Sequence, residues 1–188
     1  MTRLHLRQHA PDRAHRTVSV TPESAGWTYV GFDLHRLAPG ETAMAETGDR
    51  EVCLVFVAGT GRATAGDRDF GLLGQRMSPF DGKPFALYVP AGARWSGTPQ
   101  TPPQPAACSP PGAGGSRPAP GLRPGPPRRV APGKGSNVRY VTDIINETDP
   151  ADGLLVVEVI TPAVNASSYP PHKHDRDAFP EETRLEEV

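Results

Sequence analysis

A short stretch near residue 170 carries the residue types that bind metal ions. It reads Ser167-Ser168-Tyr169-Pro170-Pro171-His172-Lys173-His174-Asp175, and Leu185-Glu186-Glu187-Val188 follows. Side chains alternate between the two faces of a β-strand, so His172 and His174 would point to one side and Lys173 to the other. Two imidazoles on one face, joined by a carboxylate from a neighbouring strand, suit Zn, Fe, Mn or Ni. The spacing therefore predicts a divalent-metal site.

Glu186 and Glu187 are the candidates for the carboxylate ligand. In an extended segment these two side chains occupy opposite faces, so only one of them can share a site with both histidines. The alternative interpretation is a polar, solvated tail whose histidines contact nothing, because short metal motifs also arise by chance. Spacing alone leaves both interpretations open.

The composition argues against several classes of protein. The formal net charge of the 188 residues is −1, which does not favour a nucleic-acid or membrane partner. No apolar run reaches the ~20 residues that a membrane-spanning helix needs, and residues 1–6 lack the apolar core of a secretory signal. Cys53 and Cys108 lie in very different sequence surroundings, so we expect no disulfide framework. A cytoplasmic protein is the simplest prediction.

Residues 21–96 read as short strands separated by turns. The clearest is Glu51–Val57, a nearly continuous apolar run that predicts a strand buried on both faces. Turn signals such as Pro39-Gly40 and Pro90-Ala91-Gly92 separate the strands. Many short strands without a helical period predict a β-sandwich or barrel. The basic residues 1–20 are expected to form a solvated N-terminal arm.

Residues 97–134 differ in composition from their surroundings. They hold 12 of the 23 prolines, and no acidic residue occurs between Asp81 and Asp143. Such a segment buries too little apolar surface to offset its ordering entropy, which predicts a proline-rich disordered segment. A slip of the coding frame is one explanation for this composition. Order is expected to resume over residues 135–188, where a strong strand at Gly153–Ile160 leads to the histidine pair.

The order of these motifs resembles a cupin, a small double-stranded β-helix barrel. Pro39-Gly40-Glu41, the strand from Glu51 to Gly59 and Pro90-Ala91-Gly92 match the cupin skeleton, but histidine is absent at its ligand positions. The resemblance thus implies an all-β fold whose N-terminal cupin, residues 21–96, is incomplete and free of metal. Residues 135–188 would then begin a second, truncated cupin that binds metal.

A more specific resemblance rests on seven segments. They are Gly26–Phe32, Gly74–Phe80, Tyr88–Gly92, Asn137–Tyr140, Glu158–Pro162, Ser167–Asp175 and Leu185–Val188. In this order they resemble the 5-deoxyglucuronate isomerase family, bicupin enzymes of inositol catabolism. The resemblance covers about residues 20–96 and 135–188. It implies an aldose–ketose isomerisation that converts 5-deoxyglucuronate to 5-dehydro-2-deoxygluconate.

The resemblance also implies roles for the residues near the histidine pair. His172, His174 and Glu187 would hold a divalent metal (Zn, Mn, Fe or Ni), which polarises the carbonyl and stabilises the developing oxyanion. Glu186 would act as the general base or as a partner that orients a ligand. The expected partner is a small deoxy-uronic acid rather than a nucleic acid or a membrane, and assembly into a homo-oligomer is left open.

The same family pattern implies a further histidine ligand and more strands beyond Val188, so we expect these 188 residues alone to be an inactive fragment. A competing hypothesis is a non-enzymatic sugar-binding or regulatory cupin module, which would use the first barrel and need no histidine pair. A third hypothesis is a neighbouring uronate isomerase acting on a keto-deoxyuronate, but those enzymes lack the long Arg176–Arg184 insertion.

Overall fold

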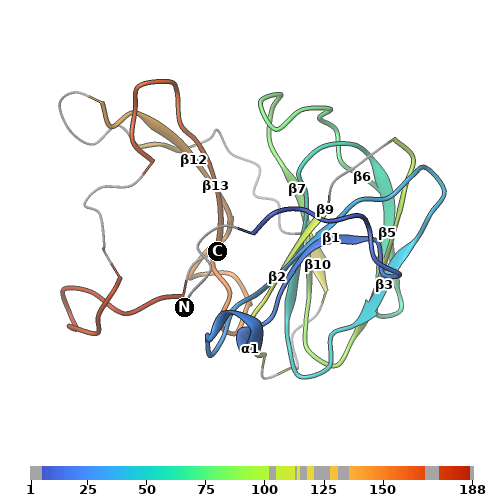
Figure 1. Cartoon of the computed structure of the whole chain (residues 1–188), viewed down its shortest axis with the longest axis horizontal. Coiled ribbons are helices and arrows are strands. Elements are labelled where there is room, and N and C mark those ends of the chain that lie inside the picture. The colour runs from blue at the N-terminus through green and yellow to red at the C-terminus, as the bar shows by residue number, and fades with distance from the viewer. Residues whose placement is uncertain are drawn as a thin grey trace.

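The computed structural model of the chain describes residues 6–101, 105–112, 114, 118–120, 128–130, 136–167 and 174–186. Apart from the four-residue helix α1 (Pro22–Ala25), every regular element in these ranges is a β-strand, which confirms the predicted all-β fold class. Figure 1 shows two parts, a barrel formed by the first strands and a smaller sheet beside it.

Ten strands belong to the barrel and three to the smaller sheet within the described residues. The barrel strands are β1 (Arg16–Val20), β2 (Gly31–His35), β3 (Ala43–Glu46), β4 (Val52–Phe56), β5 (Gly61–Ala65), β6 (Arg68–Leu73), β7 (Phe85–Val89), β8 (Arg94–Pro99), β9 (Pro105–Ser109) and β10 (Ala119–Pro120). The smaller sheet contains β11 (Arg128–Val130), β12 (Arg139–Ile145) and β13 (Val156–Ile160).

The barrel is built from two antiparallel sheets that face each other. One has six strands in the order β1-β2-β9-β4-β7-β10, and the other has four in the order β3-β8-β5-β6. Side chains from both sheets fill the space between them, among them Leu54, Leu87 and Trp95. This is the cupin barrel that the turn pattern predicted. The smaller sheet, in the order β11-β12-β13, is also antiparallel.

Strand β4 is buried on both faces, as its apolar run predicted. Because side chains alternate along a strand, Leu54 and Phe56 point into the barrel core. Cys53 and Val55 point the other way, where they pack in a second core cluster with residues of the smaller sheet. The members of that cluster from the smaller sheet and the loop between its strands are Ile144, Ile145, Leu154 and Val156. The six-stranded sheet therefore lies between two hydrophobic cores.

The prediction of a disordered segment over residues 97–134 is wrong in part. Residues 97–99 complete β8, and 105–109 form β9, which pairs with β2 on one side and β4 on the other. Pro105 is tolerated because it is the first residue of its strand. The small residues Ala106 and Ala107 are buried there, so a central strand needs no large aliphatic residue. The first barrel consequently extends beyond residue 96.

Two further points bear on the predicted domains. The N-terminal arm over residues 1–20 is not wholly solvated, since β1 pairs with β2 and Val20 is buried. Parts of the proline-rich segment, at 102–104, 113, 115–117, 121–127 and 131–134, lie outside the described residues.

A buried carboxylate joins the barrel to the smaller sheet. Glu51, immediately before β4, has no exposed surface. It accepts hydrogen bonds from the hydroxyl of Tyr88 (2.7 Å) and from the backbone N–H groups of Asp152 (2.9 Å) and Gly153 (2.7 Å). Asp152 and Gly153 lie in the loop that connects β12 to β13. These bonds satisfy a charge that would otherwise be costly to bury.

A buried ion pair forms a second connection. The Arg76 guanidinium is almost fully buried and pairs with Glu158 on β13 through two hydrogen bonds, one of 2.9 Å from Nη1. Its Nε donates to the carbonyl of Val57 at 2.8 Å, and Nη1 also donates to Pro79 at 3.1 Å. Backbone carbonyls of the barrel part therefore position Arg76, and the Glu158 carboxylate of the smaller sheet neutralises its charge.

We predict that Glu51→Ala destabilises the fold strongly, because it leaves the Tyr88 hydroxyl and two backbone N–H groups without their acceptor. The expected loss is about 3 kcal/mol in the free energy of unfolding, measured by urea denaturation. The matched control is Glu46→Ala, since Glu46 pairs with Arg94 on the exposed surface. That change should cost less than about 1 kcal/mol. Equal losses for the two variants would contradict the role given to Glu51.

Candidate functional site

The chain around His174 folds back on itself. The backbone N–H of Leu185 donates to the carbonyl of His174 at 3.1 Å, and a β-bridge joins Ala178 to Glu182. The N–H of Arg184 donates to the Asp177 carboxylate at 2.8 Å. The Arg176–Arg184 insertion therefore forms a compact turn that brings Leu185, the neighbour of Glu186 in the chain, back to His174.

His174 lies in a turn, with a φ of 73°, rather than in the strand that the alternation argument assumed, and a hydrogen bond orients its ring. Its Nδ1 lies 2.9 Å from the carbonyl oxygen of Thr183. A carbonyl only accepts hydrogen bonds, so Nδ1 carries the proton, and the lone pair of the neutral ring is on Nε2. A metal-binding histidine is usually fixed in this way, by donating its other ring N–H to a carbonyl or carboxylate. The donor chemistry of His174 therefore fits a metal ligand.

Glu186 contacts the first barrel. Its carboxylate accepts hydrogen bonds from three successive backbone N–H groups, those of Thr28 (2.7 Å), Tyr29 (2.7 Å) and Val30 (3.0 Å). Partial burial raises its pKa, but these three bonds and the positive charge of Arg184 outweigh burial, so the pKa is lowered overall. A carboxylate held in this way is a weak base. Glu186 was predicted to act as the general base or as a partner that orients a ligand. These contacts favour the orienting role over that of the general base.

The structure places only part of the predicted site. His172 and Glu187 lie outside the described residues, so it does not test whether they approach His174. Among the residues that are described, no group of three or more His, Cys, Asp or Glu side chains is close enough to hold a metal ion. The ligand set His172, His174 and Glu187 thus stays a prediction.

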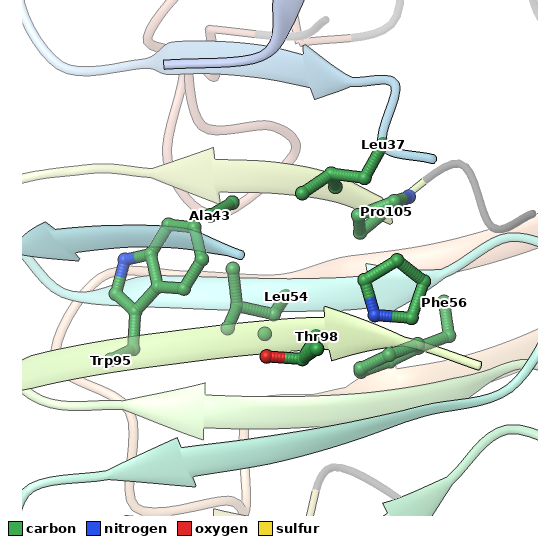
Figure 2. Close-up of a pocket in the computed structure, with 9 residues that line it drawn as sticks. Leu37, Ala43, Leu54, Phe56, Trp95, Thr98 and Pro105 are labelled. Carbon is green, nitrogen blue, oxygen red and sulfur yellow. The ribbon is translucent and has the colours of Figure 1, made fainter. Parts of the chain in front are cut away.

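The barrel contains an apolar cavity, shown in Figure 2. Its lining residues are Leu37, Ala43, Leu54, Phe56, Trp95, Gly97, Thr98, Pro99 and Pro105. Among these described lining residues, the polar side-chain groups are the Thr98 hydroxyl, which is hydrogen-bonded to the hydroxyl of Thr42 at 2.7 Å, and the indole N–H of Trp95. The cavity therefore offers a charged sugar acid neither an ion-pairing partner nor a set of hydrogen-bonding groups.

Sequence reasoning missed a buried histidine near this cavity. His35, at the end of β2, is 4% exposed and meets the Trp95 ring edge-to-face at a centroid distance of 5.7 Å. Its Nδ1 donates to the carbonyl of Ala14 at 3.1 Å, while Nε2 has no hydrogen-bond partner within the described residues. Its place at the end of a short strand gave no signal of this burial.

Burial lowers the pKa of His35 because it disfavours the charged imidazolium. The hydrogen bond to Ala14 and the negative charges of Asp33 and Asp12 act against this effect, and the positive charge of Arg16 adds to it. Since the net shift is downward, His35 remains neutral in the folded protein at pH values where a solvent-exposed histidine is already protonated.

Two relatives of this chain carry the same name. The model of the KduI/IolB family matches residues 4–188. A relative from Geobacillus kaustophilus (strain HTA426), named 5-deoxy-glucuronate isomerase, is 43% identical over 189 residues, which cover 100% of this chain and 68% of the relative. A relative of the same name from Geobacillus thermodenitrificans (strain NG80-2) is 40% identical, with 100% and 69% covered.

A solved structure is similar along almost the whole chain. The IolB-like protein from Salmonella typhimurium LT2 is 37% identical and superposes with a TM-score of 0.83, covering 97% of this chain and 67% of that protein. These similarities place the chain in the class of aldose–ketose isomerases, which are intramolecular oxidoreductases. The chain belongs to the KduI/IolB family.

In the described part of the chain, no helix is long and apolar enough to cross a membrane.

We predict a pH-dependent stability that depends on His35. Folding lowers the pKa of His35 from the unfolded value of 6.5. The neutral side chain therefore contributes its full share to the free energy of unfolding above pH 6.5. This contribution is lost as the pH falls from 6.5 through the pKa of the folded state. In His35→Asn the amide can still donate to Ala14 but does not titrate. The difference in melting temperature between wild type and variant should therefore change over this range.

The control for this prediction is His9→Asn. His9 is exposed, and its Nδ1 contacts a neighbouring carbonyl, that of Ala10, at 2.7 Å. This substitution should leave the pH profile of the melting temperature unchanged. A His35→Asn profile that runs parallel to wild type from pH 8 to pH 5 would contradict the assignment.

Proposed function

We propose that this chain belongs to an enzyme of inositol catabolism that converts 5-deoxyglucuronate to 5-dehydro-2-deoxygluconate with the help of a divalent metal. The observation that carries the proposal is the 43% identity, along the entire chain, to a relative named 5-deoxy-glucuronate isomerase. The fold-back that brings Leu185, the neighbour of Glu186, beside His174 agrees with it.

His172, His174 and Glu187 are the residues we propose as ligands. When bound, the metal would polarise the substrate carbonyl during transfer of a proton between neighbouring carbons. The chain's own contribution begins with Thr183, whose carbonyl holds Nδ1–H of His174 and so directs Nε2 away from it. Glu186 then ties the same segment to the backbone of residues 28–30. Both contacts would limit the freedom of the ligand segment before substrate arrives.

A sugar-binding or regulatory module confined to the first barrel is the competing function. A sugar acid needs several hydrogen-bonding groups and at least one cation, and the described side chains of the cavity lining offer only the Thr98 hydroxyl and the Trp95 indole N–H. Buried arginine is present at Arg76, but its guanidinium is already paired with Glu158. These observations favour a site near His174 over one inside the first barrel.

We predict that His174 contributes to metal affinity in the 188-residue protein. His174→Ala should weaken Zn²⁺ binding by roughly 100-fold in a calorimetric titration, because one of the few ligands is removed. His172→Ala should have a similar effect. The matched control His9→Ala removes an exposed histidine of the first barrel and should leave the affinity unchanged. Equal affinities in all four proteins would contradict the proposed ligands.

Isomerase activity is tested in a chimera. The aligned region of the Geobacillus kaustophilus relative is replaced by these 188 residues, and conversion of 5-deoxyglucuronate is followed by NMR. We expect turnover within about tenfold of the relative, and a loss of about 100-fold or more with His174→Ala in the chimera. A folded chimera that binds metal but does not turn over would contradict the proposed reaction.

The same assay tests whether the 188-residue polypeptide is active by itself. In the described residues the second part is one three-stranded sheet, which cannot enclose a substrate as a barrel does. We therefore propose that the 188 residues alone are inactive and expect turnover at least about 100-fold below that of the chimera. Equal turnover would contradict that proposal and leave the reaction itself supported.

A further inference from the structure

The two cysteines lie directly opposite each other in the six-stranded sheet. Cys53 on β4 is paired with Cys108 on β9 in the antiparallel register, and both are free thiols. This contrasts with the sequence expectation, in which the two residues had unrelated surroundings. The sequence surroundings gave no sign that the two thiols are neighbours, because the contact joins residues far apart in the chain through β9, a strand that composition concealed.

The position of the pair meets the geometric needs of a disulfide. Residues directly opposed on antiparallel strands have Cα atoms about 4.5–5.5 Å apart, which is within the range of about 4.4–6.8 Å found across disulfides. Their side chains also lie on the same face of the sheet. A bond between the two Sγ atoms thus needs side-chain rotation and a small approach of the strands, with no change of register.

The surroundings favour a bond within one molecule. Cys53 has no exposed surface and Cys108 is half-buried, and both pack in the cluster between the barrel and the smaller sheet. A thiol of a second molecule cannot reach Cys53 there, whereas Cys108 is its direct neighbour. Any oxidised form of Cys108 will therefore meet Cys53 before another thiol.

We propose that Cys53 and Cys108 are a redox modification site, at which a peroxide converts the two thiols into a cross-strand disulfide that thiol reductants reverse. In the first step the partly exposed Cys108 is oxidised to a sulfenic acid, and the peroxide releases one water. In the second step the sulfur of Cys53 attacks that of Cys108 and a second water leaves. The two thiols together lose two electrons and two protons, and the O–O bond of the peroxide is reduced.

The reaction is slow at neutral pH because the thiolate is the reactive form. Burial raises the pKa of Cys108 to about 11, and burial together with the neighbouring Cys108 and Glu51 raises the pKa of Cys53 well above its usual value. The pair thus differs from a fast peroxide sensor, whose thiol has a lowered pKa. It would respond to prolonged oxidation, and its rate should rise with pH as Cys108 ionises.

The experiment treats the folded 188-residue protein with hydrogen peroxide at pH 7 and pH 9 and analyses it by mass spectrometry without reductant. We expect a monomer that has lost two hydrogens, a proteolytic fragment linking Cys53 to Cys108, faster formation at pH 9, and recovery with dithiothreitol. The oxidised protein should melt roughly 5 °C or more above the reduced one, because the bond closes a long loop.

Two controls keep the outcome decisive. Cys108→Ala should show no linked fragment and no gain in melting temperature, and its effect on folding is small because Cys108 is half-buried and neighbours Ala107. Wild-type protein oxidised in urea shows which disulfides and oxidation products the unfolded chain forms. The proposal is overturned if the native protein accumulates only sulfinic acid or disulfide-linked dimers. A Cys53–Cys108 bond that forms only in urea would overturn it as well.

Discussion

The structure depends on the burial of both faces of the six-stranded sheet. One face lines the barrel core, and the other carries the smaller sheet through Cys53, Val55 and their apolar partners. Removing apolar surface from water is the main favourable contribution to folding, and this sheet buries apolar side chains on both of its faces. The smaller sheet has three strands in the described part of the chain, and its buried apolar side chains are covered by the barrel. Its stability therefore depends on the barrel.

Charged side chains give this packing a defined orientation. An apolar contact alone tolerates sliding, because the hydrophobic effect has no direction. Glu51 and Arg76 are buried beside the second core cluster, and each reaches across to a particular partner, the 152–153 backbone or Glu158. A displaced sheet would leave these charges without partners, at a cost of several kcal/mol. The barrel and the smaller sheet are thus fixed relative to each other by a few polar contacts around an apolar centre.

The position of the candidate site follows from the orientation of the smaller sheet on the barrel. Strand β13 leads toward the histidine pair, and the fold-back from His174 to Leu185 returns the chain to the barrel, where Glu186 meets residues 28–30. Glu186 thus attaches the later end of this segment to the loop that precedes β2. The barrel, whose own cavity is apolar, would contribute to catalysis by positioning a site outside itself.

Local patterns in the sequence were sufficient for some features of this protein. The apolar run before Gly59 predicted a strand buried on both sides, and the turn signals predicted a β-sandwich or barrel. These predictions rest on periodicity and turn chemistry, which act between residues close in the chain. Composition failed over 97–134, because proline content describes an average and β9 needs only a few small residues between two strands.

Long-range contacts were decided by the tertiary structure alone. The partners of Glu51, the burial of His35, the three N–H groups that hold Glu186 and the pairing of Cys53 with Cys108 each join residues that no local pattern connects. Alternation could state that Glu186 and Glu187 face opposite ways, but it could not state what either one meets. The physical reason is that a strand's own residues determine which side chains share a face, while the order of strands in the sheet determines which neighbours those side chains contact.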